Sequence, residues 1–325
     1  MKVALIFGSS GQDGSYLASQ LISSNYSVHG VSARPQAAPF TNHLTLNIDQ
    51  HINYHHIDYA RPEHIIHLIK SLQPDEIYIL NGPSSVSYSF EAPATVLRVI
   101  PSTTLIVLDS VRLYSSHSRI YHAASSECFG ETISPHGACI NDSFDPKSPY
   151  ALAKIHSHNM IKYYRETFGI FACSGFLFNH ESPLRSDRFV TSKIVTTACQ
   201  IALGMADSLV LGRLDISRDW GYAPEYTQAM HLMLAASTPR DYLICTGTSS
   251  TLLHFVNLVF DSLNLQAHHY LAQSDAHCRP NDIVHSKGNP AEATECLKWS
   301  AKTHLPELVH ILVREKLSSL TSLRA

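Results

Sequence analysis

The sequence predicts an α/β protein with a doubly wound parallel sheet in its first part and a smaller lobe in its C-terminal part. Short β-branched runs alternate with amphipathic stretches through the first half, and a glycine-rich turn follows the first run directly. After about residue 178, prolines and polar residues interrupt this pattern. We therefore expect a sheet domain over residues 1–178, to which a segment at about 214–248 returns, and a lobe over residues 179–325.

The individual elements follow from hydrophobic periodicity and turn residues. Strands are expected at residues 3–7, 27–31, 76–80 and 120–123, and a further strand is expected to end near residue 57. Helices are expected at residues 16–23, 61–72 and 93–115. Because a helical crossover returns the chain in the same direction, these strands should run parallel and be covered by the helices.

Composition excludes several classes of function. Charged residues make up 16% of the 325 residues and the net charge is -3, without a basic run that would contact nucleic-acid phosphates. The longest apolar stretches are only as long as a strand, so we expect no membrane span. Seven scattered cysteines without a Cys-x-x-Cys pair, and 21 histidines without metal-ligand spacing, predict a cytoplasmic protein with no metal site.

A Gly-x-x-Gly-x-x-Gly turn lies between the first expected strand and the first helix. Glycine permits the tight turn and the close approach of a pyrophosphate, and the N-terminal amides of the helix attract the anion. The alternative is an ordinary glycine-rich turn. We expect a dinucleotide to be bound at this turn by Gly8, Gly11, Gln12, Asp13 and Gly14.

The residues after the second and third strands bear on the choice of cofactor. The stretch after the second strand has no acidic residue to bind an adenosine 2'-hydroxyl and offers Arg34 instead, which favours NADP over NAD. Arg34 as a solvated surface residue is the alternative. Asp58 lies where a third strand would end and could accept a hydrogen bond from the adenine amine, or it could cap a turn.

Tyr150 and Lys154 form a Tyr-x-x-x-Lys pair on a helix that Ser148 would cap and Pro149 would begin. The spacing places both side chains on one helix face. An ammonium beside a phenol favours the phenolate and should lower the pKa of Tyr150, which could then accept a hydroxyl proton during hydride transfer. Lys154 would also hold the nicotinamide ribose. The pair alone is a weak signal, but the glycine turn upstream strengthens it.

Ser125 and Glu127 follow the strand expected at residues 120–123, at the edge of the sheet where ligands bind in such folds. The Ser125 hydroxyl could complete a Ser-Tyr-Lys set. Glu127 could remove a proton alpha to a new ketone, which a simple dehydrogenase does not require. Alternatively, Glu127 caps a helix or pairs with a surface lysine.

These motifs together resemble the GDP-mannose 4,6-dehydratase family of extended short-chain dehydrogenases/reductases, which have a Rossmann-type sheet. The resemblance covers most of the chain and is carried by the segments at residues 11–18, 126–127, 148–154, 164–166, 177–183, 189–191 and 218–221. It implies internal redox chemistry. Tyr150 would take the C4 hydroxyl proton while C4 hydride passes to NADP, Glu127 would remove the C5 proton, water would leave from C6, and the hydride would return to C6.

The resemblance also implies roles for further residues, and it makes the lobe at residues 179–325 the mainly substrate-binding part. His180 and Arg185 match positions near the cofactor. Positions that hold the sugar nucleotide are matched by Ser84, Ser126, Asn179, Val190, Lys193, Arg218, Arg279 and Asp282. A small-molecule nucleotide sugar is therefore the expected partner.

Several positions depart from the family pattern. Leu184 and Ser186 replace an Arg and a Gly in a loop that reaches a neighbouring subunit in the family, so a homo-oligomer is expected with dimer and tetramer both open. Pro83 and Ser85 replace a Gln and a His beside the nicotinamide. Two alternatives therefore stay open: a GDP-sugar C4 oxidoreductase or epimerase that removes no water, and a catalytically silent NADP-binding paralogue.

Overall fold

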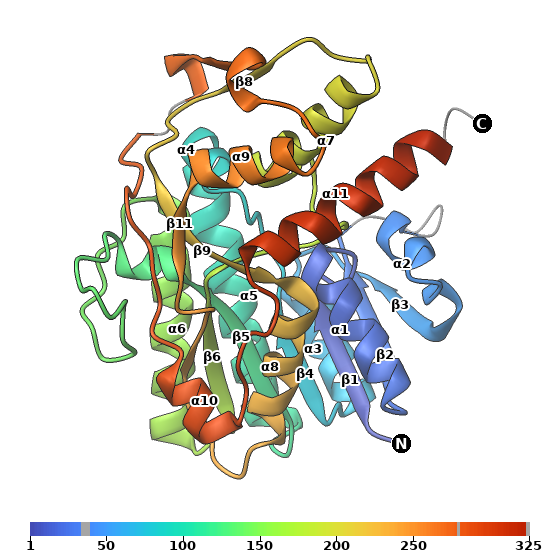
Figure 1. The fold of residues 1–325 in the computed structure, drawn as a ribbon. Coiled ribbons are helices and arrows are strands. Elements are labelled where there is room, and N and C mark those ends of the chain that lie inside the picture. The colour runs from blue at the N-terminus through green and yellow to red at the C-terminus, as the bar shows by residue number, and fades with distance from the viewer. Residues whose placement is uncertain (34–39, 278–279, 323–325) are drawn as a thin grey trace.

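The computed structural model describes residues 1–33, 40–277 and 280–322, and its centre is a parallel sheet of seven strands (Figure 1). Every pairing in this sheet is parallel. The strands lie in the order β10 (Tyr242–Ile244), β6 (Ala172–Leu177), β5 (Arg119–Ser125), β4 (Glu76–Ile79), β1 (Val3–Phe7), β2 (Ser27–Ser32) and β3 (Ile52–His56). The order reverses on either side of β1, which is typical of a doubly wound sheet.

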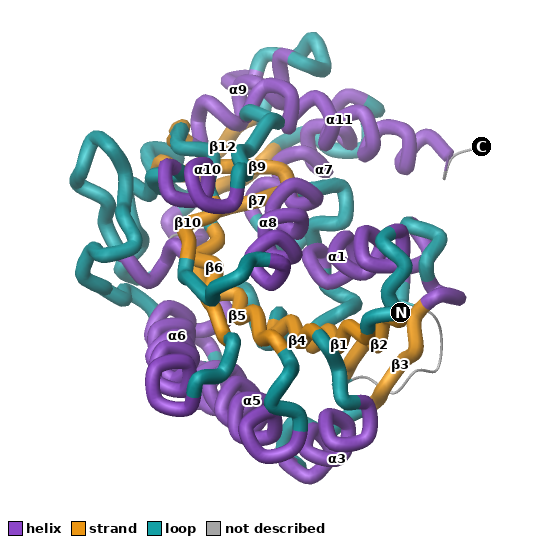
Figure 2. Tube along the Cα trace, turned by 90° about the horizontal axis from the view of Figure 1, so that it is seen from below, coloured by secondary structure: helices purple, strands orange, loops and turns teal. Residues whose placement is uncertain are grey.

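Helices cover both faces of this sheet (Figure 2). One face is covered by α1 (Gln12–Ser23) and α8 (Ala223–Ala235), and the other by α3 (Pro62–Leu72), α5 (Pro93–Tyr114) and α6 (Pro149–Phe168). The predicted α/β doubly wound fold is therefore confirmed. By length and composition α5 could cross a membrane, but half of its apolar window is buried where it packs between α3 and α6.

The lobe has its own small sheets and its own apolar core. A three-stranded sheet contains β11 (Ser249–Thr251), β9 (Ser217–Tyr222) and β7 (Asn179–Glu181), and a second sheet pairs β12 (Leu271–Gln273) with β8 (Leu209–Leu211). The core of the lobe includes Phe255 and Leu308 and is surrounded by the helices α7 (Val190–Ala202), α9 (Leu252–Asp261) and α11 (Leu305–Ser322). The segment expected to return contributes β9 to the lobe, and α8 and β10 to the sheet domain.

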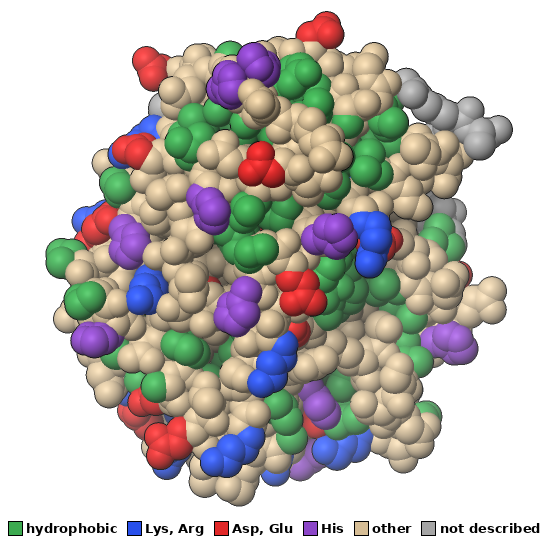
Figure 3. Space-filling view, in the orientation of Figure 1, with side chains coloured by type: hydrophobic (Ala, Val, Ile, Leu, Met, Phe, Trp, Pro, Cys, Tyr) green, Lys and Arg blue, Asp and Glu red, His purple; other side chains and the backbone are tan. Residues whose placement is uncertain are grey.

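Short elements complete the chain. They are α2 (Thr41–Thr45), η1 (Asp49–His51), α4 (Val86–Glu91), η2 (Ser126–Phe129), η3 (Ala267–His269), η4 (Asp275–His277) and α10 (Ala291–Leu297). Of these, α10 packs against β10 and α8. The face of the molecule in Figure 3 intersperses basic and acidic side chains, with exposed histidines scattered between them. Among the described residues no group of three His, Cys, Asp or Glu side chains could hold a metal ion.

The helix that carries the Tyr-x-x-x-Lys pair begins and ends as local chemistry requires. The Ser148 hydroxyl accepts a hydrogen bond from the Ala151 N–H at 3.1 Å, and Pro149 occupies the first helical position, where no N–H is needed. Gly169 ends the helix with a φ of 66°, a backbone conformation that glycine adopts without strain. The expected start of α6 is therefore confirmed.

Candidate active site

A cleft lies at the carboxyl ends of the central strands, between the sheet domain and the lobe. On the sheet side it is lined by the turn after β1 and the segments after β4 and β5, and on the lobe side by β7, β9 and the start of α7. The predicted site residues that line it are Gly8, Gly11, Gln12, Asp13, Gly14, Ser84, Ser125, Ser126, Glu127, Tyr150, Lys154, Asn179, His180, Arg185, Val190 and Arg218.

The glycine turn forms a cradle that side chains would fill. Gly8 has a φ of +86°, and a Cβ atom on Gly14 would lie 2.6 Å from the Cα of Ser9. Gly11 occupies the N-cap position of α1 and supplies no side-chain acceptor to the first helical N–H groups. These amides are therefore available to an anion, as at other dinucleotide sites.

His43 supports this turn from behind, and sequence reasoning missed it. The side chain is fully buried, with Nε2 2.8 Å from the Ser9 carbonyl oxygen and Nδ1 2.7 Å from the Tyr54 hydroxyl. Burial lowers the pKa of His43, so the ring is held neutral. His43 is one of 21 histidines and lies in no motif, so the sequence offered no signal that could have singled it out.

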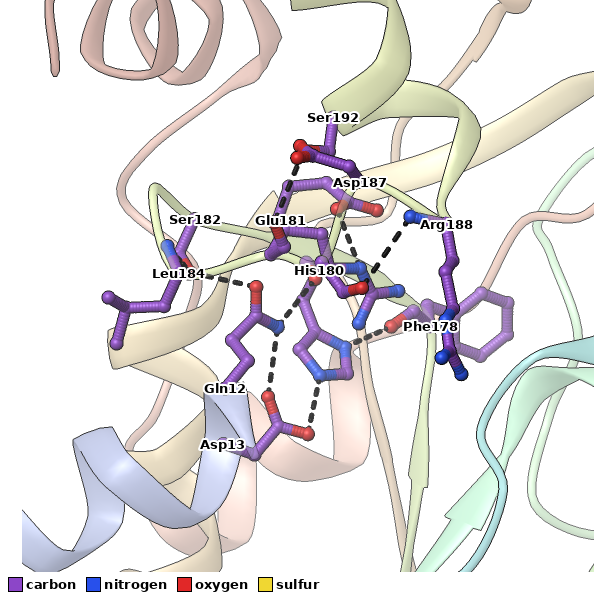
Figure 4. A network of polar contacts seen from close by, with 12 residues as sticks. Gln12, Asp13, Phe178, His180, Glu181, Ser182, Leu184, Asp187, Arg188 and Ser192 are labelled. Carbon is purple, nitrogen blue, oxygen red and sulfur yellow. Dashed lines mark hydrogen bonds and ion pairs between the residues drawn. The ribbon is translucent and has the colours of Figure 1, made fainter. Parts of the chain in front are cut away.

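An ion pair joins the glycine turn to the lobe (Figure 4). His180 Nε2 on β7 lies 3.0 Å from Asp13 Oδ2 on α1, and its Nδ1 lies 2.6 Å from the Phe178 carbonyl oxygen. Burial opposes both charges, but the charge and hydrogen bond of His180 lower the pKa of Asp13 to about 2. Asp13 in turn raises the pKa of His180. Both ring nitrogens of His180 are therefore engaged with partners inside the protein.

Gln12 extends the same network. Its amide donates to Asp13 Oδ1 at 3.0 Å and to the His180 carbonyl at 3.1 Å, and its carbonyl accepts from the Ser182 hydroxyl at 2.7 Å. Arg185 lies nearby, with Nε 3.0 Å from Glu181 Oε2 in an ion pair that is not aligned as a hydrogen bond. The first helical turn of α1 is thus fixed against β7 and the loop that follows it.

Tyr150 and Lys154 both reach the cleft, but their electrostatics differ from the sequence prediction. The Lys154 ammonium donates to the Ala123 carbonyl at 2.6 Å and lies 5.6 Å from the centre of the Tyr150 ring. Burial raises the pKa of Tyr150, against a smaller lowering by the Ser125 hydroxyl. Burial also lowers the pKa of Lys154 to about 8. The expected lowering of the pKa of Tyr150 is wrong for this arrangement, because desolvation outweighs the lowering by Ser125 and Arg185.

Ser125 and Glu127 lie beside Tyr150. Ser125 ends β5, and its hydroxyl accepts from the Glu127 N–H at 3.3 Å. Glu127 is half-buried in η2, and its charge contributes to raising the pKa of Tyr150. A hydroxyl, a phenol, an ammonium and a carboxylate therefore line one cleft. Such a set can transfer a proton at one carbon and remove a second proton at a neighbouring carbon.

The remaining predicted residues differ in whether they line the cleft. Arg218 is buried and pairs with Asp282 at 3.1 Å, and Asp282 itself is not among the residues lining the cleft. Lys193 donates to the Val210 carbonyl at 2.7 Å and is not among the lining residues either. Asp58 is exposed after β3 and accepts from the Ala60 N–H at 2.9 Å, as a turn-capping residue does. Arg34 and Arg279 lie outside the described residues.

Known proteins resemble this chain over nearly its whole length. A family model described as GDP-mannose 4,6 dehydratase matches residues 5–312. The chain is 36% identical to GDP-mannose 4,6 dehydratase 2 of Arabidopsis thaliana over 97% of this chain and 87% of that protein. It is 33% identical to a GDP-mannose 4,6-dehydratase of Sinorhizobium fredii over 99% of both. The structure of RMD from Pseudomonas aeruginosa complexed with NADPH shares the fold, with a TM-score of 0.81, 18% identity and coverage of 98% and 100%.

Proposed function

The chain belongs to the GDP-mannose 4,6-dehydratase family, and we propose that it is an NADP-dependent hydro-lyase that converts GDP-mannose, or a closely related GDP-sugar, to its 4-keto-6-deoxy derivative. The single observation that carries the proposal is the placement of Glu127 in the same cleft as Ser125, Tyr150 and Lys154. Alcohol oxidation needs only the last three. Removal of water from the neighbouring carbons needs a separate base, which the carboxylate supplies.

NADP fits the glycine turn, because the cradle at Gly14 has no room for a side chain and the amides at the start of α1 face the cleft without a capping side chain. The end of β2, at Ser32 and Ala33, offers no carboxylate to repel a 2'-phosphate, and the related fold of RMD holds NADPH. When bound, NADP supplies the hydride acceptor for C4 and the donor for C6.

The chain's own residues then divide the proton chemistry. The positive charge of an oxidised nicotinamide would oppose the effect of burial on Tyr150 and favour its phenolate, which takes the proton of the C4 hydroxyl while Ser125 holds the same oxygen by a hydrogen bond. Oxidation at C4 acidifies the C5–H bond, and Glu127 removes that proton and delivers it to the departing C6 hydroxyl, which leaves as water. C5 regains a proton when C6 is reduced, and the proton that Tyr150 took from the C4 hydroxyl balances this uptake. Buried Lys154, held by the Ala123 carbonyl, places a cation beside the phenol.

Glu127→Gln tests this assignment. Incubation with GDP-mannose and NADP, followed by mass spectrometry, should show loss of water with the wild-type protein and no such product with Glu127→Gln. NADP affinity should be the same in both. Glu295→Gln, an exposed change on α10, serves as the matched control. An undiminished yield of dehydrated product from Glu127→Gln would rule out the elimination role, and C4-epimerised product would favour the epimerase alternative.

A homo-oligomer is the proposed assembly, with α5 and α6 as its contact. These helices pack side by side and expose the apolar side chains Leu105, Leu113, Leu152 and Tyr163. Burial of such side chains against a second copy would be favourable. Leu105→Glu should shift the mass measured by light scattering to that of a monomer, and an unchanged mass would place the contact elsewhere.

A cytoplasmic location stays a prediction.

A further inference from the structure

Four lysine and arginine side chains line the cleft among the described residues, and they differ in how their charges are compensated. Arg185 lies 3.0 Å from Glu181, and Arg218 lies 3.1 Å from Asp282. Lys154 is bound to the Ala123 carbonyl beside Tyr150. Arg188 is exposed and makes no ion pair within the described part of the chain. In Figure 4 its side chain extends away from the neighbouring Asp187 and Glu181.

Arg188 lies one residue before Phe189, the N-cap of α7, and no side chain caps the first turn of this helix. Phe189 is the N-cap residue of this 13-residue helix and offers no side-chain acceptor to the first N–H groups. Thr191, in that first turn, is 2% exposed and lines the cleft, and its hydroxyl has no hydrogen-bond partner among the described residues. A buried hydroxyl without a partner is costly, so a ligand acceptor at this point would stabilise it.

An uncompensated guanidinium, free helical amides and an unpartnered hydroxyl together form a site for an anion. We propose that Arg188 binds the diphosphate of the sugar nucleotide, with the first turn of α7 and Thr191 on the other side of the same phosphate groups. This inference rests on the proposed function and deepens it, since it assigns a specificity residue that no motif contains. Arg suits a diphosphate because its planar fork binds two oxygens at once.

The cofactor also carries phosphates, but the position of Arg188 favours the substrate. Its chain neighbours Phe189, Val190 and Thr191 line the lobe side of the cleft with Ile216 and Trp220. The glycine turn and the end of β2 lie on the sheet side, where a pyrophosphate and a 2'-phosphate are expected. The charge of Arg188 therefore faces the ligand that the lobe holds.

Calorimetric titration of the full chain with GDP, guanosine and NADP tests the assignment. Arg188→Ala should weaken GDP binding by about tenfold or more, since a charge-assisted hydrogen bond is worth about that factor. Binding of guanosine, which has no phosphate, and of NADP should be unchanged. Arg188→Lys should retain part of the GDP affinity because it keeps the charge without the fork. The loss caused by Arg188→Ala should shrink at high ionic strength.

Arg240→Ala, which removes an exposed arginine away from the cleft, is the matched control and should leave all three affinities unchanged. Wild-type GDP affinity in Arg188→Ala would overturn the proposal. An equal loss of guanosine affinity would also overturn it. A loss of NADP affinity without a loss of GDP affinity would overturn it too, and would place the contact at the cofactor. Because GDP binding requires no turnover, failure of the dehydratase assay and failure of this inference are separate results.

Discussion

Replacing Asp13 by Asn would remove one charge from the pair that joins the glycine turn to β7. Asp13 Oδ2 lies 3.0 Å from His180 Nε2, and the side chains are 22% and 9% exposed. The residues are 167 positions apart in the chain, so the pair connects the sheet domain to the strand that enters the lobe. An ion pair shielded in this way is screened less by water and salt than a surface pair.

The pKa of Asp13 gives the size of the expected effect. Burial acts to raise this pKa, but His180 lowers it to about 2 from an ordinary 3.8. At 1.36 kcal/mol per pKa unit this difference is about 2 kcal/mol. The contribution of Asp13 is present above pH 3.8 and is lost as the pH falls toward 2. The pKa of His180 is raised above 6.5, so its contribution is complete below pH 6.5 and is lost as the pH rises through the raised value.

The coupling energy of the pair can be measured by urea denaturation at about pH 6 and about pH 9. The proteins compared are the wild type, Asp13→Asn, His180→Gln and the double variant. We expect Asp13→Asn to lower the free energy of unfolding by about 2 kcal/mol near pH 6, and by less near pH 9, because His180 loses its charge as the pH rises through its raised pKa. Asp109→Asn, in an exposed pair with Arg112, should cost no more than about 1 kcal/mol. A coupling energy below about 0.5 kcal/mol near pH 6, or equal losses at both pH values, would refute this reasoning.

Three further outcomes follow from the site. Gly14→Ala should abolish NADP binding in a fluorescence titration, because its Cβ would lie 2.6 Å from the Ser9 Cα. The control Gly169→Ala, whose Cβ has nothing within 4 Å, should cost only about 1–2 kcal/mol of backbone strain. Normal NADP affinity in Gly14→Ala would contradict the assignment of the glycine turn as the NADP site. Tyr150→Phe should lower turnover by roughly 10² to 10⁴ with NADP affinity intact, and a smaller loss would remove the phenol from the proton transfer. The kcat/KM for GDP-mannose should decline above pH 8, because burial lowers the pKa of Lys154 to about 8; a constant value from about pH 7 to 9 would show that the Lys154 charge is not needed.

The sequence was sufficient for features that depend on a few neighbouring residues. The strand expected at residues 3–7 is β1, the helix expected at 93–115 is α5, and α6 begins at Pro149 after its Ser148 cap. It was not sufficient for the three-stranded sheet of β7, β9 and β11. Those strands are short and come from segments separated by loops and helices, so no single window of sequence contains their pattern.

The same division applies to the site. The glycine turn and the Tyr-x-x-x-Lys pair could be recognised from sequence because spacing along one strand, turn or helix decides where their side chains point. The support of the turn by His43, the Asp13–His180 pair and the compensation of Arg218 by Asp282 could not, since each joins distant parts of the chain. The sequence alone therefore determined the hydroxyl, carboxylate, phenol and ammonium groups of the site. Only the tertiary structure decided their charge states and partners, because burial and pairing depend on atoms that folding brings together; the raised pKa of Tyr150 is the clearest example.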